Sequence, residues 1–364
     1  MRTILTAASC LVAACSSHAE APTPPPPRID TVVVDALVDL VQDVRHWFVG
    51  DVHMHVSPPD DPADVAMSSD EIAEAARAAH MDFVVLTPHV SKTRWTTRRR
   101  GFQQAWGPFA DHAREVKEPT LIPGVEYNNG AGHFTIAGFD LTTAHDDDLL
   151  REAHGAGAFI SVNHPFAVPT HIPGIPVSDA NMSYRVWTED APGFEDEDAV
   201  EVWNVPLSLA NLISRPGGRT GEARAWSAAN RYVHAHRRQL GAVGGTDNHQ
   251  FAVRPTTWVL ADDASPAAIL AALKEGATCV GGPEAGTLRA HGDGDPAGAW
   301  VRVGGASHAP TTMTLTWDGT ARVFVDDVDQ GEHTTSFTHA TGGEPHTYRI
   351  EIGASRCSFI YANL

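Results

Sequence analysis

Short apolar runs alternate with longer segments of helical periodicity through most of the chain. Residues 82–87 contain the run FVVL, which is typical of a buried strand, and residues 69–80 before them predict a helix that opens on a Ser68/Glu71 capping box. Further strands are predicted at 49–56, 120–126, 133–139, 158–163, 199–204 and 241–246, and further helices at 102–117, 147–154, 222–239 and 266–274. This alternation predicts a mainly parallel α/β sheet or barrel.

The pattern changes after Gly282. From there on, short segments alternate polar and apolar residues with a period of two, between turns rich in Gly, Asp and Thr, and no helical periodicity is present. These segments are 312–317, 322–328, 347–352 and 357–361. We therefore expect an α/β domain over 31–283 and a small β-sandwich-like C-terminal module over 284–364.

The first 30 residues have the composition of a targeting segment. Arg2 is followed by an apolar run that is too short to span a bilayer, which predicts a signal peptide over 1–14. The run closes on VAAC and resembles a bacterial lipobox, with Cys15 as the lipidated residue; an ordinary cleavage site with an incidental cysteine is the alternative. The Pro-rich residues 15–30 predict a semi-rigid linker. We expect an extracytoplasmic lipoprotein that meets the membrane only through this lipid.

Composition narrows the classes of partner. The 364 residues include 26 Lys and Arg against 45 Asp and Glu, for a formal net charge of −19, so phosphate backbones are repelled and no nucleic-acid partner is expected. Cys279 and Cys357 could pair in an oxidising compartment or remain two buried thiols, and the sequence leaves both open. The unusual feature is the 20 histidines.

Histidines and carboxylates recur where the predicted strands end. His53 and His55 share one face of a strand and can bind one metal ion, whereas His234 and His236 fall on a predicted helix and point about 200° apart. Other predicted strand ends carry His89, Glu126, His133, His164, Asp247 and His249. Because the ends of barrel strands meet at one mouth, the joint pattern predicts a metal site there.

The order of these residues resembles the PHP (polymerase and histidinol phosphatase) family. The motifs are Asp51-x-His53-x-His55, Gly124-x-Glu126, Gly132-His133, Asn163-His164 and Asp247-x-His249, together with Asp60 and His89. The chain looks most like the extracytoplasmic branch named after a carbaryl hydrolase. The resemblance covers about residues 47–282 and implies a distorted seven-stranded (β/α) barrel with two or three metal ions at its mouth.

The resemblance also implies a ligand set. The first ion would be held by His53, His55, Glu126 and Asp247, the second by Glu126, His133 and His164, and the third by Asp60, His89 and His249. Such ligands suit Zn²⁺, Mn²⁺ or Fe²⁺. Pro88 stands where the family has Asp, and Pro59-Asp60-Asp61 replaces Ser-Asp-Gly, which leaves Asp60 and Asp61 open as ligands. Both departures fall at the third ion, so a centre of two ions is an alternative.

Two adjacent ions can hold a bridging hydroxide and direct it at phosphorus or carbon. We therefore expect a metal-dependent hydrolase, with a phosphoesterase acting on a small phosphate ester favoured over an aryl ester or carbamate hydrolase. Lys92, Arg94 and Arg98 lie in the densest cationic segment and could contact an anionic ester substrate; a solvated helix start is the alternative. From another functional class, the chain could be a non-catalytic metal-binding lipoprotein.

Overall fold

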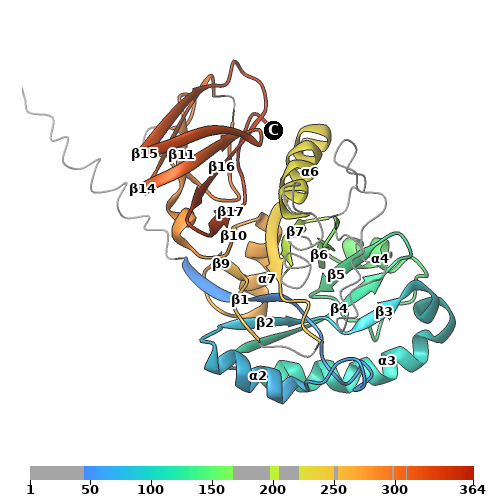
Figure 1. Cartoon of the computed structure of the whole chain (residues 1–364). Coiled ribbons are helices and arrows are strands. Elements are labelled where there is room, and N and C mark those ends of the chain that lie inside the picture. The colour runs from blue at the N-terminus through green and yellow to red at the C-terminus, as the bar shows by residue number, and fades with distance from the viewer. Residues whose placement is uncertain (1–44, 167–196, 205–220, 250–252, 297–298, 309) are drawn as a thin grey trace, which may run out of the picture. The chain divides into compact units, whose positions relative to one another are not determined.

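The computed structural model describes residues 45–364, except 167–196, 205–220, 250–252, 297–298 and 309. The residues from Arg45 onward belong to one compact unit of mixed α/β structure (Figure 1). The predicted signal peptide (1–14), the linker (15–30) and the start of the α/β domain at residue 31 lie outside the described residues. No described helix combines the length and apolarity needed to cross a membrane.

In the α/β part, the order of the strands across the sheet follows their order along the chain. β1 (His46–Met54) is parallel to β2 (Phe83–Leu86), and β2 is parallel to β4 (Thr120–Asn128). The order continues through β5 (His133–Ala137), β6 (Phe159–Asn163), β7 (Ala199–Asn204) and β8 (Gly241–Gly245). A bridge between Met54 and Asn248 then returns the order to β1. The ends of non-adjacent strands are thereby gathered around one centre.

The sheet is mixed, which differs from the mainly parallel arrangement predicted from the sequence. β5 is antiparallel to both β4 and β6. Residues 129–132 are too few for the crossover that parallel strands require, so β4 and β5 form a hairpin. β9 (Thr257–Ala261) and β10 (Thr278–Val280), which the periodicity did not predict, extend the sheet antiparallel beyond β1. The periodicity also did not predict β3 (His89–Ser91), which is parallel to the second half of β4.

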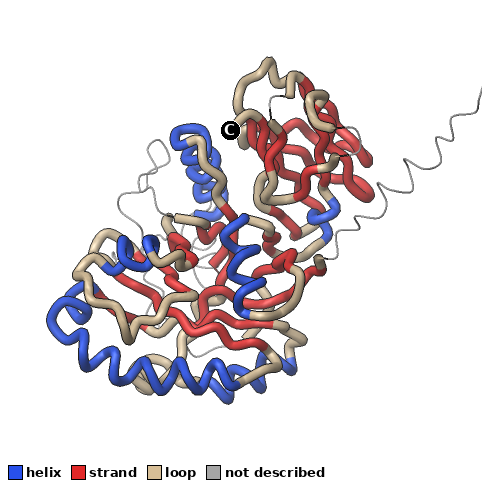
Figure 2. The backbone as a smooth tube through the Cα atoms, turned by 180° about the vertical axis from the view of Figure 1, so that it is seen from behind, coloured by secondary structure: helices blue, strands red, loops and turns tan. Residues whose placement is uncertain are grey.

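Five described helices accompany these strands, and four lie close to their predicted positions. α2 (Ser69–Ala78) begins with the predicted capping box at Ser68 and Glu71. α4 (Leu149–Gly155), α6 (Gly221–His236) and α7 (Pro266–Glu275) also match the prediction. α3 (Lys92–Glu115) begins ten residues earlier than predicted, because its first turns carry Lys, Thr and Arg rather than an apolar stripe. The tube in Figure 2 shows these helices outside the strands.

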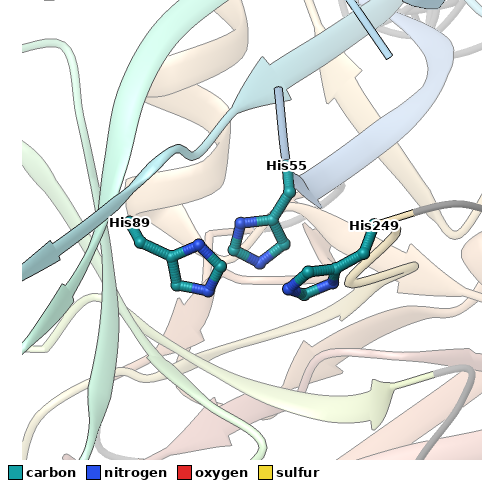
Figure 3. Close-up of side chains that lie close together, drawn as sticks. All are labelled: His55, His89 and His249. Atoms are coloured by element: carbon teal, nitrogen blue, oxygen red, sulfur yellow. The ribbon is translucent and has the colours of Figure 1, made fainter. Parts of the chain in front are cut away.

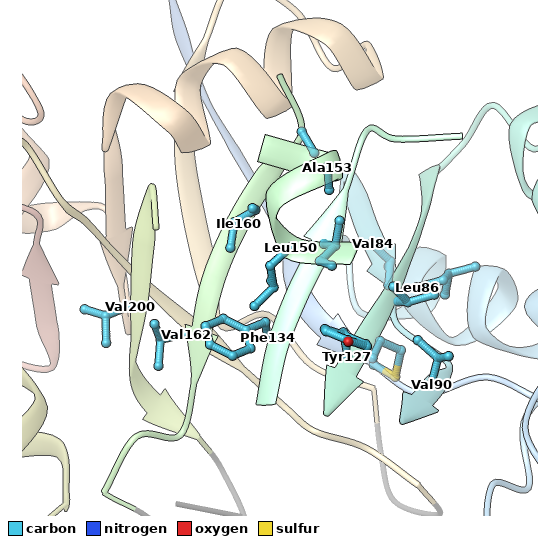
Figure 4. Packing of buried hydrophobic residues seen from close by; sticks show 14 of the residues in the cluster. Val84, Leu86, Val90, Tyr127, Phe134, Leu150, Ala153, Ile160, Val162 and Val200 are labelled. Carbon is cyan, nitrogen blue, oxygen red and sulfur yellow. The ribbon is translucent and has the colours of Figure 1, made fainter. Parts of the chain in front are cut away.

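Buried apolar side chains from the α/β strands form one core (Figure 4). Val84, Tyr127, Phe134, Ile160 and Val200 are each at most 2% exposed, and they come from five different strands. Trp95, Phe102 and Trp106 of α3 join the same cluster. Burial of apolar surface on this scale fixes the strand bodies, and polar residues can therefore be held in place at the strand ends.

Strands dominate the chain after Gly282. A short 3₁₀ helix, η1 (Glu284–Thr287), is followed by β11 (Arg289–Gly292), β12 (Val301–Arg302), β13 (Ala306–Ser307), β14 (Thr312–Val325), β15 (Val328–Ala340), β16 (His346–Ile352), β17 (Ser355–Cys357) and β18 (Ile360–Ala362). β14 and β15 form a long hairpin. Leu315, Val323, Tyr348 and Ile350 belong to a second core cluster.

Covalent and hydrogen bonds join this β-rich segment to the α/β part. Cys279 of β10 and Cys357 of β17 face each other on paired strands and form a disulfide, one of the two states that the sequence left open. The Tyr361 hydroxyl donates to the Leu240 carbonyl at 3.0 Å. The Ala242 amide donates to Ser358 Oγ at 2.7 Å. Because β10 and β17 are paired, the sheet continues across the boundary predicted at residues 283–284.

Replacing both Cys279 and Cys357 by Ser should lower the free energy of unfolding by about 2–5 kcal/mol. The disulfide spans 78 residues, so its loss returns considerable loop entropy to the unfolded chain. Urea denaturation of the two proteins under non-reducing conditions measures the difference. With a reductant present, the wild-type curve should move onto that of the variant; coincident curves without reductant would contradict the expectation.

Candidate metal centre

The structure brings all the ligand candidates of the resemblance into one cluster at the strand ends. They are His53 and His55 at the end of β1, Asp60 in the turn beyond it, His89 opening β3, Glu126 in β4, His133 opening β5, His164 after β6, and Asp247 and His249 after β8. Successive members are joined by close polar contacts, as described below. Residues nearly 200 positions apart thus become neighbours.

Glu126 lies at the centre of this cluster and is buried. Its Oε1 atom is 3.0 Å from His133 Nδ1 and 3.2 Å from both His53 Nε2 and His164 Nε2. Its Oε2 atom is 3.5 Å from the Nε2 atoms of His55 and His89. The two carboxylate oxygens therefore face two different sets of imidazoles, which is the arrangement that a bridging ligand needs.

Among the residues that the structure describes, four groups of possible metal ligands have their donor atoms within 4.8 Å of one another. They are His53/His55/Asp247, Glu126/His133/His164, His55/His89/His249 and His53/His164/Glu201. The first two match three-residue parts of the first and second ligand sets implied by the resemblance. The third group contains His55 in the place expected for Asp60. The fourth contains a carboxylate that the sequence did not point to.

Three imidazoles from distant parts of the chain converge in the third group (Figure 3). The ring centroid of His55 lies 4.0 Å from that of His89 and 4.1 Å from that of His249. Buried His55 Nδ1 has no hydrogen-bond partner among the described residues; Asp60 Oδ2, 3.5 Å away, lies beyond good hydrogen-bond range. A buried donor atom without a partner fits a position where a metal ion binds.

Asp60, rather than Asp61, belongs to the cluster. Asp60 is buried; its Oδ1 accepts from the His89 amide at 2.9 Å, and its Oδ2 lies 3.2 Å from His89 Nδ1. Asp61 is exposed and accepts a hydrogen bond from the Ala63 amide. Pro88, the departure from the family pattern, accepts from the Glu126 amide through its carbonyl.

Glu201 in β7 is a site residue that the sequence analysis missed. Its Oε1 lies 3.2 Å from His53 Nδ1, and its Oε2 accepts from the His164 amide at 2.7 Å. The available signal was a single acidic residue inside the apolar run AVEVWN. Gly245 makes room for this contact, because a Cβ there would lie 2.3 Å from Glu201 Oε1 and 2.4 Å from His53 Cβ. Glu201 therefore orients two of the candidate ligands.

Asp51, part of the motif that carries the resemblance, has a structural role beneath the cluster. Its carboxylate accepts from the amides of His53 and Thr246, at 3.0 and 3.2 Å, and from the Thr246 hydroxyl. Burial raises the pKa of Asp51 to about 6 despite these hydrogen bonds. The residue ties β1 to the segment that carries Asp247.

The electrostatics of the cluster favour cations. Burial alone would raise the pKa of Glu126, but the charges of His133 and His53 outweigh it and hold that pKa well below its ordinary value. Burial alone would lower the pKa of His164, but Glu126 and Asp247 raise it to about 9. Without metal, the carboxylates thus favour the protonated forms of His53 and His164, whose pKa values are both raised. Divalent cations would supply the same positive charge, and this imidazole and carboxylate set fits Zn²⁺, Mn²⁺ or Fe²⁺.

The cluster is more exposed on one side. The side chains of His89 and His249 are 37% and 30% exposed, whereas those of His53, His55 and Glu126 are at most 2% exposed. α3 begins three residues after His89, and its first turns carry the cationic segment. Lys92 and Arg98 are exposed there, and Arg94 donates to the His89 carbonyl at 3.4 Å. These residues form a helix start that lies beside the more exposed imidazoles.

Comparison with known proteins leaves the family open. No family model and no curated protein matches the chain. A two-domain protein from Bacteroides vulgatus ATCC 8482, described as containing a predicted PHP-like metal-dependent phosphoesterase, aligns over 86% of this chain and 92% of its own, with 16% identity and a TM-score of 0.44. A carbon–nitrogen hydrolase from Helicobacter pylori G27 aligns over 59% and 83%, with 10% identity and a TM-score of 0.25. Both likenesses are too weak to carry an argument.

Exchanging Glu201 for Gln should weaken metal binding about 10- to 100-fold, because the neutral amide no longer fixes and polarises the His53 imidazole. Competition between the protein and a chromogenic chelator for Zn²⁺ measures the affinity. Glu71→Gln, the same exchange at the exposed capping box of α2, is the matched control and should leave affinity unchanged. Equal zinc affinity in all three proteins would exclude an orienting role for Glu201.

Proposed function

We propose that this chain is a metal-dependent hydrolase of the PHP type and that it cleaves a small phosphate ester. The observation that carries the proposal is the position of Glu126, whose two oxygens face separate groups of imidazoles. The order of pairing from β1 through β8 and back to β1 is compatible with the seven-stranded barrel that the resemblance implies.

In this proposal, His53, His55, Glu126 and Asp247 hold one ion, and Glu126 shares a second with His133 and His164. Asp60, His89 and His249 form the third position, where His55 also lies within reach. When bound, such ions lower the pKa of water and stabilise negative charge on the transferred group. The protein's own contribution is orientation: Glu201 fixes His53 and the His164 backbone, and Asp51 fixes the turn that carries Asp247.

The substrate's anionic group is proposed to approach past His89 and His249, the more exposed ligands. Arg94 is held beside His89 by its bond to the His89 carbonyl and by its position over the Phe102 ring, 5.1 Å from the centroid. Lys92 and Arg98 share the same helix start. Their positive charge favours a phosphate ester over a neutral aryl ester or carbamate.

Full-length protein should contain divalent metal and hydrolyse nitrophenyl phosphate mono- or diesters faster than nitrophenyl acetate or an aryl carbamate. His53→Ala and Glu126→Gln should each reduce hydrolysis by about two orders of magnitude or more, and a chelator should abolish it. Elemental analysis by mass spectrometry reports the metal, and His112→Ala, at an exposed histidine of α3 paired with Asp70, is the control.

The outcomes separate the alternatives. If the purified protein contains no metal and its activity is unchanged by both substitutions, a metal-dependent hydrolase is contradicted. Metal-loaded protein that hydrolyses no member of the panel would favour the non-catalytic metal-binding lipoprotein. Faster cleavage of the acetate or carbamate would favour the other hydrolase class.

We also propose that the protein works outside the cytoplasm, anchored by a lipid on Cys15. The Cys279–Cys357 disulfide supports an oxidising compartment. Mass spectrometry of protein extracted from bacterial membranes should find a mature chain that starts at a lipidated Cys15. A chain that starts elsewhere, or one recovered entirely from the cytoplasm, would contradict this location.

A further inference from the structure

An irregularity in β7 brings a further polar residue, Asn204, to the candidate metal centre. Glu201 pairs with Val243 of β8. Trp203, two residues later, pairs with Gly244, so β7 advances two residues where β8 advances one. Side chains alternate between the two faces of a regular strand, so residues three positions apart would project to opposite faces. The extra residue in β7 shifts this alternation, and Asn204 comes to the same face as Glu201, to which it is hydrogen-bonded.

The side-chain amide of Asn204 joins two carboxylates. Asn204 is buried at the end of β7. Its Nδ2 atom donates to Glu201 Oε2 and to Asp247 Oδ2, each at 3.2 Å, and lies 3.3 Å from Glu201 Oε1. Because an ionised carboxylate can only accept hydrogen bonds, the nitrogen of the amide, and not its oxygen, must face these atoms. One amide group thus links β7 to the segment that follows β8.

The bond from Asn204 determines which oxygen of Asp247 faces the imidazoles. Asp247 Oδ1 lies 3.0 Å from His55 Nε2 and 3.6 Å from His53 Nε2. Asp247 Oδ2, the oxygen bonded to Asn204, is 3.9 Å from His164 Nε2. A carboxylate turns easily about its last side-chain bond unless a partner holds it. Asn204 therefore favours the orientation in which Oδ1 faces His53 and His55.

The same amide lies between two buried acidic residues. Glu201 and Asp247 both have oxygens within 3.3 Å of the Asn204 nitrogen, and like charges repel strongly in the interior of a protein. A donor shared by the two carboxylates offsets part of this cost. Glu201 has to keep its place, because it contacts His53 Nδ1 at 3.2 Å and accepts from the His164 amide at 2.7 Å. Loss of Asn204 should therefore disturb Asp247 directly and His53 through Glu201.

We propose that Asn204 is a positioning residue of the candidate metal centre, which presents Asp247 Oδ1 to the first ion and keeps Glu201 against His53. Asn204 acts through these two carboxylates. The inference rests on the proposed function, because it concerns an ion that the proposed hydrolase uses.

Competition between the full-length protein and a chromogenic chelator for Zn²⁺ tests the role of Asn204. Asn204→Leu keeps a side chain of similar size and loses the donor, so it should weaken zinc binding about 10- to 100-fold. Asn230→Leu is the matched control, because Asn230 of α6 is also buried and accepts a hydrogen bond from the Thr347 hydroxyl. This control should lower the melting temperature and leave zinc affinity unchanged. Wild-type zinc affinity in Asn204→Leu would overturn the proposal.

A double-mutant cycle separates positioning from a general loss of stability. In an Asp247→Ala background, the further loss of zinc affinity caused by Asn204→Leu should be smaller than in the wild type, by about twofold or more, because the carboxylate that Asn204 orients is gone. An equal loss in both backgrounds would overturn the proposal. If Asn204→Leu does not fold, Asn204→Ser, whose shorter donor cannot serve both carboxylates, must weaken zinc binding to sustain it.

The same measurements separate this proposal from the proposed function. If the zinc affinities change as expected and the protein hydrolyses no ester, the hydrolase function is contradicted and the role of Asn204 stands. If the protein hydrolyses a phosphate ester and Asn204→Leu binds zinc as the wild type does, only the role of Asn204 is contradicted.

Discussion

A carboxylate buried at the centre of the strand ends is the constraint on which the site depends. An ionised Glu126 inside protein is unfavourable unless positive charge or hydrogen-bond donors surround it. His133, His53 and His164 meet one of its oxygens, and His55 and His89 meet the other. These imidazoles come from β1, β3, β5 and the end of β6. The imidazoles can surround the Glu126 carboxylate only if the strands pair in the register that brings those ends together. The fold and the candidate metal centre therefore depend on each other.

A surrounding layer of polar residues holds this arrangement in place. The Asn163 amide donates to Glu126 Oε1 at 3.1 Å, and the Asn204 amide donates to Asp247 Oδ2 at 3.2 Å. His164 and Asp247 have φ values of 30° and 48°, a region that side-chain-bearing residues rarely occupy. Their neighbours stabilise these conformations through the bonds of Glu201 and Asn204, and non-glycine residues in this region tend to cluster at functional sites.

The β-rich segment after Gly282 supports β8, the strand that leads to Asp247, through hydrogen bonds. Ser358 accepts from the Ala242 amide of β8, and Tyr361 bonds both backbone groups of Leu240 just before that strand. β8 leads directly to Asp247, so its position affects the candidate metal centre. The disulfide holds the two parts together near this contact.

The sequence by itself determined most local structure and most of the cluster. Periodicity located β1 and α2, and alternation along a strand placed His53 and His55 on one face. The sequence did not reveal the antiparallel direction of β5, the choice of Asp60 over Asp61 or the role of Glu201. Periodicity reports which face of an element is buried, whereas strand partners and neighbours across 100 or more residues depend on the packing of the whole chain. Only the tertiary structure could therefore decide them.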